Sequence, residues 1–184
     1  MKSLIHISMA SMVLALGACQ DKKPAEPETV VQDGSPVCPP EQVLADISTY
    51  SNEVADPTLS EAEWFAENGK KKGVHTTPSG LQYRINKSGP KNGPNPLPTN
   101  TVRVNYHGQF FDGKTFDSSY RRHKDIEFPL NRVIKGWTEG VGLMKPCDAW
   151  TFYIPSDLAY GPGGKGPIPP ATPLMFHVQL IEIK

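Results

Sequence analysis

The feature that most constrains the fold is a strict alternation of apolar and polar residues in the second half of the chain. Between residues 101 and 106, Val102, Val104 and Tyr106 are separated by polar residues. Side chains of a β-strand point alternately to the two faces of a sheet, so this pattern predicts a strand with one buried face. Asp112-Gly113 follows it and suits the turn of a β-hairpin.

The segments beyond this hairpin predict the rest of the domain. Further strands are expected at Asp125–Leu130, Ala149–Ile154 and Leu174–Ile183, and one short helix at Lys135–Met144. In the last strand the alternation breaks at Glu182, and Ile183 falls on the face opposite Leu180. A series of strands with a single helix among them predicts an α+β domain, in which the helix packs on an antiparallel sheet.

The first nineteen residues have the pattern of a secretory signal. Lys2 is followed by an uncharged, mostly apolar stretch as far as Leu16, which is shorter than a membrane span requires. Leu16-Gly17-Ala18-Cys19 resembles a bacterial lipobox, so we expect residues 1–18 to be removed and Cys19 to be acylated. The alternative is an ordinary signal peptide, with Cys19 a free thiol. Gln20 after the cysteine favours sorting to the outer membrane, on the periplasmic side of the envelope.

Two further segments precede the predicted sheet. Residues 19–40 are polar and rich in proline, which indicates a flexible tether. Residues 41–73 carry helical patterning in two pieces, and Ser60 with Glu63 predicts a capping box at the start of the second. Residues 74–184 would then form the globular domain.

The remaining cysteines and the overall charge limit the functions available. Cys38 and Cys147 could form a disulfide in an oxidising compartment or remain separate thiols, and the residues alone leave both open. Neither has a second cysteine or histidine at metal-ligand spacing, so we expect no metal site there. The chain has 19 basic and 19 acidic residues, and this balance argues against a nucleic-acid partner.

Motifs of common enzyme chemistry are absent from the sequence. It contains no glycine-rich phosphate loop, no HExxH and no nucleophile elbow, so no cofactor is expected. His107 and His177 are predicted on polar strand faces and His123 in a loop, where isolated histidines are usually surface residues. Aromatic side chains instead stand where the predicted strands end and loops begin.

Several of these segments together resemble a known family. This chain resembles the FKBP-type peptidyl-prolyl cis/trans isomerases in several segments that occur in the same order along the sequence. These segments are Val104–Gly108, Asp112–Ser119, Val133–Val141, Ala159–Gly161, Ile168–Pro170 and Leu174–Phe176. Glu63–Asn68, Gly73-Val74 and Ser79–Tyr83 resemble the lead-in of the bacterial Mip-like branch, whose members are exported and often dimeric. The resemblance implies a five- or six-stranded antiparallel half-barrel around one short helix, preceded by a short helical segment.

The resemblance also implies a site for isomerising Xaa-Pro bonds in proline-containing polypeptides. Trp137 would be the floor under the prolyl ring, and the walls would be Tyr106, Phe116 and Phe176. The apolar cup would be completed by Phe128, Val133, Ile134 and Ile168. The Ile134 backbone N–H and the Tyr160 hydroxyl would hold substrate carbonyls, and Asp117 would orient Tyr106. Macrolide inhibitors of the family would bind the same pocket.

Other interpretations of these residues remain. Inward-facing Tyr106, Trp137 and Phe176 also suit the core of any small half-barrel, and a pocket of this kind could serve a chaperone or binding module without turnover. The lead-in is shorter than the helical dimerisation domain of larger Mip-like proteins, which leaves both homodimer and monomer open. Cys147 stands where relatives usually carry a small residue, and Lys165 replaces a histidine that some relatives carry.

Overall fold

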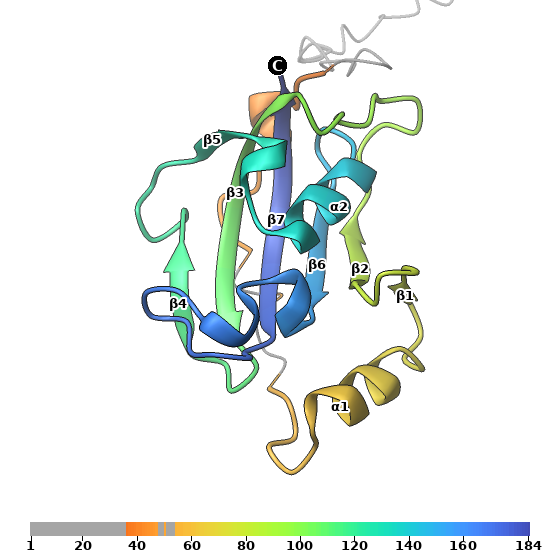
Figure 1. The fold of residues 1–184 in the computed structure, drawn as a ribbon. Coiled ribbons are helices and arrows are strands. Elements are labelled where there is room, and N and C mark those ends of the chain that lie inside the picture. Colours follow the sequence, from red (N-terminus) through yellow and green to blue (C-terminus); the bar gives the residue numbers. More distant parts are fainter. Residues whose placement is uncertain (1–35, 48–49, 51–53) are drawn as a thin grey trace, which may run out of the picture. The chain divides into compact units, whose positions relative to one another are not determined.

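The computed structural model describes residues 36–47, 50 and 54–184, which form one antiparallel sheet with two α-helices (Figure 1). The predicted signal peptide, Cys19 and residues 20–35 of the predicted tether lie outside this range. The strands are β1 (Val74–Thr76), β2 (Gln82–Lys87), β3 (Thr101–Phe110), β4 (Thr115–Ser118), β5 (Ile126–Pro129), β6 (Ala149–Ile154) and β7 (Leu174–Ile183). The helices are α1 (Glu61–Asn68) and α2 (Lys135–Leu143), and 3-10 turns occur at η1 (Pro40–Gln42), η3 (Leu130–Arg132), η4 (Ser156–Leu158) and η5 (Gly161–Gly163).

The sheet confirms the predicted α+β fold and is wider than expected. Its strands follow the order β1-β2-β6-β7-β3-β4, and β5 also pairs with β3. Seven strands replace the five or six that the resemblance implies. The excess arises at the edges, where β1 adds three residues beside β2, and where β5 and β4 pair with successive halves of β3.

Helix α2 packs closely on one face of this sheet because two of its three glycines, Gly136 and Gly140, face strand β6. A Cβ atom on Gly136 would lie 2.6 Å from Ile154 Cγ2, and one on Gly140 would lie 2.7 Å from Phe152 Cε1. These glycines are four residues apart and therefore share one face of the helix. Their missing side chains bring α2 against β6, and Trp137 and Val141 on the same helix are buried in the core.

A β-bulge explains the broken alternation at the end of β7. Arg103 pairs with Glu182 and Val104 with Leu180, so Ile181 is an extra residue opposite β3. The extra residue reverses the faces beyond it. Ile183 therefore packs against the same core cluster as Leu180, whereas Ile181 is buried on the opposite face.

The second face of the sheet is also covered, by residues 36–47, which we call the strap. It runs along the face away from α2 (Figure 1) and is hydrogen-bonded to β7, with Cys38 N–H donating to the Ile181 carbonyl at 2.7 Å. The prediction that His107 and His177 lie at the surface is therefore wrong: their exposed fractions are 8% and 0%. Alternation along a strand shows where side chains point, and it does not show what covers them.

The lead-in contains one of the two predicted helical pieces. Helix α1 begins after the predicted capping box, in which Ser60 and Glu63 bond reciprocally, and its Trp64 packs on Tyr153 of β6. Among residues 41–47, which the structure describes, the first piece is not helical beyond η1. Its backbone bonds instead to the side chain of Gln179, with Leu44 N–H donating at 2.7 Å. Neither α1 nor α2, the α-helices of the described part, is long and apolar enough to cross a membrane.

A disulfide joins the strap to the turn before β6. Cys38 and Cys147 are bonded and almost fully buried, and they form a small cluster with Ile181. Cys147 has a φ of 72°, in the left-handed region that favours glycine. Thus residues 36–40, predicted as the end of a flexible tether, are fastened to the domain.

Candidate active site

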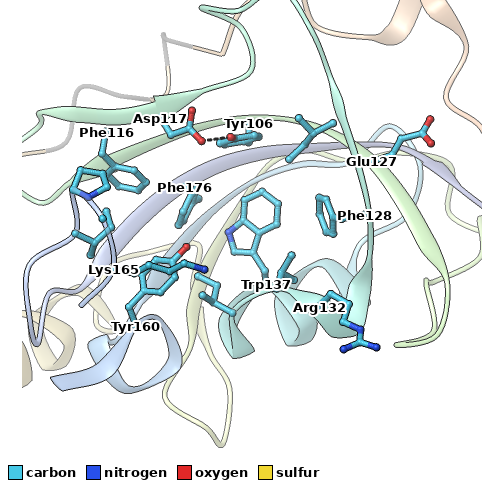
Figure 2. Close-up of a pocket in the computed structure, with 16 residues that line it drawn as sticks. Tyr106, Phe116, Asp117, Glu127, Phe128, Arg132, Trp137, Tyr160, Lys165 and Phe176 are labelled. Atoms are coloured by element: carbon cyan, nitrogen blue, oxygen red, sulfur yellow. Dashed lines mark hydrogen bonds between the residues drawn. The ribbon is translucent and has the colours of Figure 1, made fainter. Parts of the chain in front are cut away.

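A cavity of about 780 Å³ opens on the α2 face of the sheet (Figure 2). Every residue predicted to be catalytic or substrate-binding lines it, and no such residue lies elsewhere. Its lining is Tyr106, Phe116, Asp117, Ile126, Glu127, Phe128, Arg132, Val133, Ile134, Trp137, Tyr160, Lys165, Gly166, Pro167, Ile168 and Phe176. The lining residues that were not predicted as site residues are Ile126, Glu127, Arg132, Lys165, Gly166 and Pro167. The alternation within β5 could have indicated Ile126, which points the same way as Phe128.

Trp137 is the centre of the aromatic lining. Its ring centroid lies 5.4 Å from Tyr106 and 5.1 Å from Phe176, and both contacts are edge-to-face. Phe128 lies 5.5 Å away on another side. Edge-to-face contacts hold each ring in one orientation. The indole therefore forms a fixed floor, with aromatic walls at steep angles to it.

The rings of Phe116 and Phe176, which form one wall of the cavity, fit together because Gly108 has no side chain. A Cβ atom there would lie 2.7 Å from the Phe176 ring and 2.8 Å from the Phe116 ring. The two rings themselves meet edge-to-face at 5.3 Å. Gly108 thus gives both rings the room to stand beside the cavity.

Asp117 anchors a small polar network at the cavity wall. Its carboxylate accepts hydrogen bonds from the Tyr106 hydroxyl and from Arg122, and Arg122 Nη2 also donates to the Tyr106 hydroxyl at 2.8 Å. Burial raises the pKa of Asp117, but the hydrogen bonds from Tyr106 and Arg122 outweigh it and keep that pKa below its usual value. Burial and the Asp117 carboxylate raise the pKa of Tyr106 to about 12. At neutral pH the pair is carboxylate and phenol, which fixes the Tyr106 ring.

Among the hydrogen-bond donors of the lining that have no partner in the described part of the chain are the Trp137 Nε1–H, the Ile134 backbone N–H and the Tyr160 hydroxyl. The Ile134 backbone N–H stands at the N-cap of α2, in extended backbone, and donates no hydrogen bond to a described residue. The Tyr160 hydroxyl, whose pKa burial and the Asp117 charge both raise, is likewise unpaired. Donors left free beside an apolar cavity are suited to bind carbonyl oxygens of a ligand.

The proline- and glycine-rich segment 161–173 forms a flap beside the cavity. Lys165 and Ile168 exchange two backbone hydrogen bonds, each of 2.9 Å, around Gly166-Pro167. Ile168 is 6% exposed and belongs to the main core cluster. The segment is therefore shaped by a tight turn, and its apolar member reaches the cavity.

The lining is suited to binding an apolar group, because most of its side chains are aromatic or aliphatic. In the described ranges, no group of three or more His, Cys, Asp or Glu side chains is arranged to hold a metal ion. The lining can hold a compact apolar ring over Trp137 while Ile134 and Tyr160 bind flanking carbonyls.

Comparison with known proteins identifies two family models in the chain. Residues 93–181 match the FKBP-type peptidyl-prolyl cis-trans isomerase family, and residues 40–85 match the domain amino-terminal to FKBP-type peptidyl-prolyl isomerase. The first match contains the whole cavity lining.

Individual relatives agree with these matches. FKBP-type peptidyl-prolyl cis-trans isomerase FkpA of Aeromonas hydrophila is 48% identical over 122 residues, which are 66% of this chain and 45% of the relative. Outer membrane protein MIP of Legionella longbeachae is 38% identical over 77% of this chain and 61% of its own length. A peptidyl-prolyl cis-trans isomerase structure from Pseudomonas syringae has a TM-score of 0.63 at 33% identity, covering 76% of this chain and 97% of that one. The chain spans roughly half the length of the curated relatives it matches.

Proposed function

Because the chain belongs to the family of FKBP-type peptidyl-prolyl cis-trans isomerases, we propose that it accelerates rotation about Xaa-Pro bonds in folding or exported polypeptides. The observation that carries this proposal is the pairing of an aromatic cavity with two unpaired donors, the Ile134 N–H and the Tyr160 hydroxyl, on its lining.

The physical basis is the electronic structure of the amide. Its rotation barrier of about 18–20 kcal/mol comes from resonance, which is lost when the bond twists. The charge separation across the amide falls at the same time, so an apolar, water-poor cavity favours the twisted state over the planar one. Trp137 would carry the prolyl ring, and Tyr106, Phe116 and Phe176 would exclude water around it.

The polar groups hold the substrate and do not move protons. Rotation breaks no covalent bond, so neither Asp117 nor Tyr160 needs to act as an acid or base. Asp117 fixes Tyr106 and lies beside the twisting amide. The carbonyls on either side of the rotating bond are held by Tyr160 and Ile134, which gives the twist a fixed frame.

The proposal is tested by NMR exchange measurements on a short Ala-Pro peptide, with and without the protein. We expect acceleration at micromolar protein, loss of most of it in Trp137→Ala/Phe116→Ala, and a reduction of roughly tenfold in Tyr160→Phe, which removes one hydrogen bond to the substrate. Tyr83→Phe is the matched control, because Tyr83 stacks on Trp150 at 4.7 Å outside the cavity. Circular dichroism checks that each variant is folded.

Two outcomes would contradict the proposal. One is a protein that accelerates no peptide, and the other is acceleration that survives in the double variant. Suppressed aggregation of an unfolded client without acceleration would support the chaperone or binding-module function instead.

Export and lipid attachment of this chain are further parts of the proposal. They are supported by the lipobox pattern ending at Cys19, by the Cys38–Cys147 disulfide, which suits an oxidising compartment, and by the resemblance to an outer membrane protein. Residues 1–18 would be the signal peptide and the lipid on Cys19 the membrane attachment. Mass spectrometry of the mature protein would show the acyl mass, and a Cys19→Ser variant carrying the same mass would contradict it.

Macrolide inhibitors of the family would compete for the same cavity. They are expected to quench Trp137 fluorescence and to slow the peptide exchange together. A homodimer would involve the segment matched by the amino-terminal family model, residues 40–85. Sedimentation of the full chain distinguishes dimer from monomer.

A further inference from the structure

The turn in the flap determines where the Lys165 side chain points. Gly166 has a φ of 55°, and Pro167 holds its own φ near −65°, a combination typical of a type II′ hairpin turn. Lys165 and Ile168 are the directly opposite residues of this turn, joined by two hydrogen bonds. Directly opposite residues project to the same face. Since Ile168 is buried against the cavity, Lys165 projects toward the cavity as well.

Figure 2 shows the Lys165 side chain extending across Tyr160, with Arg132 on the far side of Trp137. The Lys165 ammonium lies 5.8 Å from the centroid of the Tyr160 ring. It therefore lies close to the ring that carries the hydroxyl to which we assign a substrate carbonyl. A residue held by that hydroxyl would have its own side chain within reach of the ammonium.

The charges around the cavity are unevenly balanced. Both carboxylates of the lining are paired with cations from outside it: Asp117 bonds to Arg122, and Glu127 bonds to Lys184 at 2.6 Å. In the described part of the chain, neither cation of the lining, Lys165 or Arg132, has a carboxylate within ion-pair distance. The rim of the cavity therefore carries uncompensated positive charge at both ends of its aromatic floor.

From this arrangement we propose that the site selects Xaa-Pro segments with an acidic residue next to the proline, and that Lys165 is the selecting group. This inference rests on the proposed isomerase function and adds its substrate class. Lys165 acts on specificity and is not part of the rotation itself. Arg132 adds to the attraction from the other end.

The expected effect follows from the strength of exposed ion pairs. Such pairs change equilibrium constants by up to about fivefold, because water screens them. Higher salt weakens them further, since the Debye length falls from about 8 Å at physiological ionic strength toward 3 Å at 1 M. A preference produced by Lys165 should therefore be modest and salt-dependent.

The experiment measures kcat/KM by NMR exchange for two peptide series with the full chain. One series has Glu, Gln or Lys before the proline, and the other has them after it. The readout is the Glu/Gln ratio within each protein, because this ratio cancels any general change in activity. We expect a ratio of about three to five for one series, a ratio near one for Lys165→Met, a retained ratio for Lys165→Arg and an inverted one for Lys165→Glu. Lys72→Met is the matched control, because Lys72 is an exposed lysine outside the cavity lining.

The outcomes separate this inference from the function on which it rests. Acceleration of the peptides with Glu/Gln ratios near one in both series overturns the inference alone. So does a ratio that Lys165→Met leaves unchanged. If the protein accelerates no peptide in either series, the proposed function falls and this inference falls with it.

Discussion

The disulfide between Cys38 and Cys147, neither of which lines the cavity, should stabilise the sheet. It closes a loop with a sequence separation of 109 residues and so restricts the unfolded chain. The loop-entropy relation for this length gives about 4.8 kcal/mol at 25 °C, which is an upper value for the lost free energy of unfolding on reduction.

The full loss of unfolding free energy on reduction is expected only if the strap unfolds together with the sheet. Strap and β7 share several bonds, including Cys38 N–H to the Ile181 carbonyl and Ile183 N–H to the Pro36 carbonyl at 2.9 Å. Ile47 of the strap is 1% exposed. These contacts predict cooperative unfolding, and a strap that detached first would reduce the loss.

The assay is urea unfolding followed by tryptophan fluorescence, on the oxidised protein and on the same protein in reductant. This comparison keeps both cysteine side chains and changes only the bond. We expect a loss of about 2–4 kcal/mol on reduction, since measured losses often fall below the entropic value. A loss under about 1 kcal/mol would refute the reasoning that the bridge closes a single folding unit.

A pair of variants separates the effect of the backbone conformation at residue 147 from the effect of the disulfide bond. Both lack the bridge, and they differ only at position 147, where φ is 72°. Cys38→Ala/Cys147→Gly should be more stable than Cys38→Ala/Cys147→Ala by about 1 kcal/mol, because glycine adopts this conformation without steric cost. Equal stability of the two would show that Cys147 is not strained.

Three further predictions concern close packing and a buried histidine. Gly140→Ala should lower the free energy of unfolding by about 1–3 kcal/mol, because its Cβ would lie 2.7 Å from Phe152. Gly142→Ala on the same helix should raise it by about 0.5–1 kcal/mol, because alanine favours the helix and its Cβ would make only an ordinary contact. Equal effects of the two variants in urea unfolding would contradict this. Gly108→Ala should lower isomerase kcat/KM several-fold by displacing the two pocket rings that its Cβ would meet, and normal turnover would contradict it. Burial lowers the pKa of His177 to about 3, so below pH 6.5 the unfolded chain binds a proton that the folded one does not. Unfolding free energy should therefore fall by up to about 1.4 kcal/mol per pH unit between pH 6.5 and 3, and His177→Phe should flatten that slope.

The sequence by itself determined the strand pattern, because the alternation of side chains is a local property of each segment. Alternation in β3 and the apolar face of β7 follow from side-chain period alone, and Ser60 and Glu63 place the start of α1 within one turn. The cavity residues were identified through a family resemblance, since aromatic residues on an inward face suit a core equally well.

Tertiary structure decided what covers the sheet and how its edges close. Nothing in the spacing of residues 41–47 indicates that they lie over β7 instead of forming a helix, because their partners are more than 130 residues away. A large separation in sequence, 109 residues for Cys38 and Cys147, also left their pairing open, and contacts between distant segments hid the burial of His177. Lys165 is the corresponding case at the cavity. The sequence shows a positively charged residue in the flap, and only the turn around Gly166-Pro167 shows that its side chain faces the site. Local periodicity encodes which way a side chain points, whereas the partner that meets it depends on contacts between distant segments.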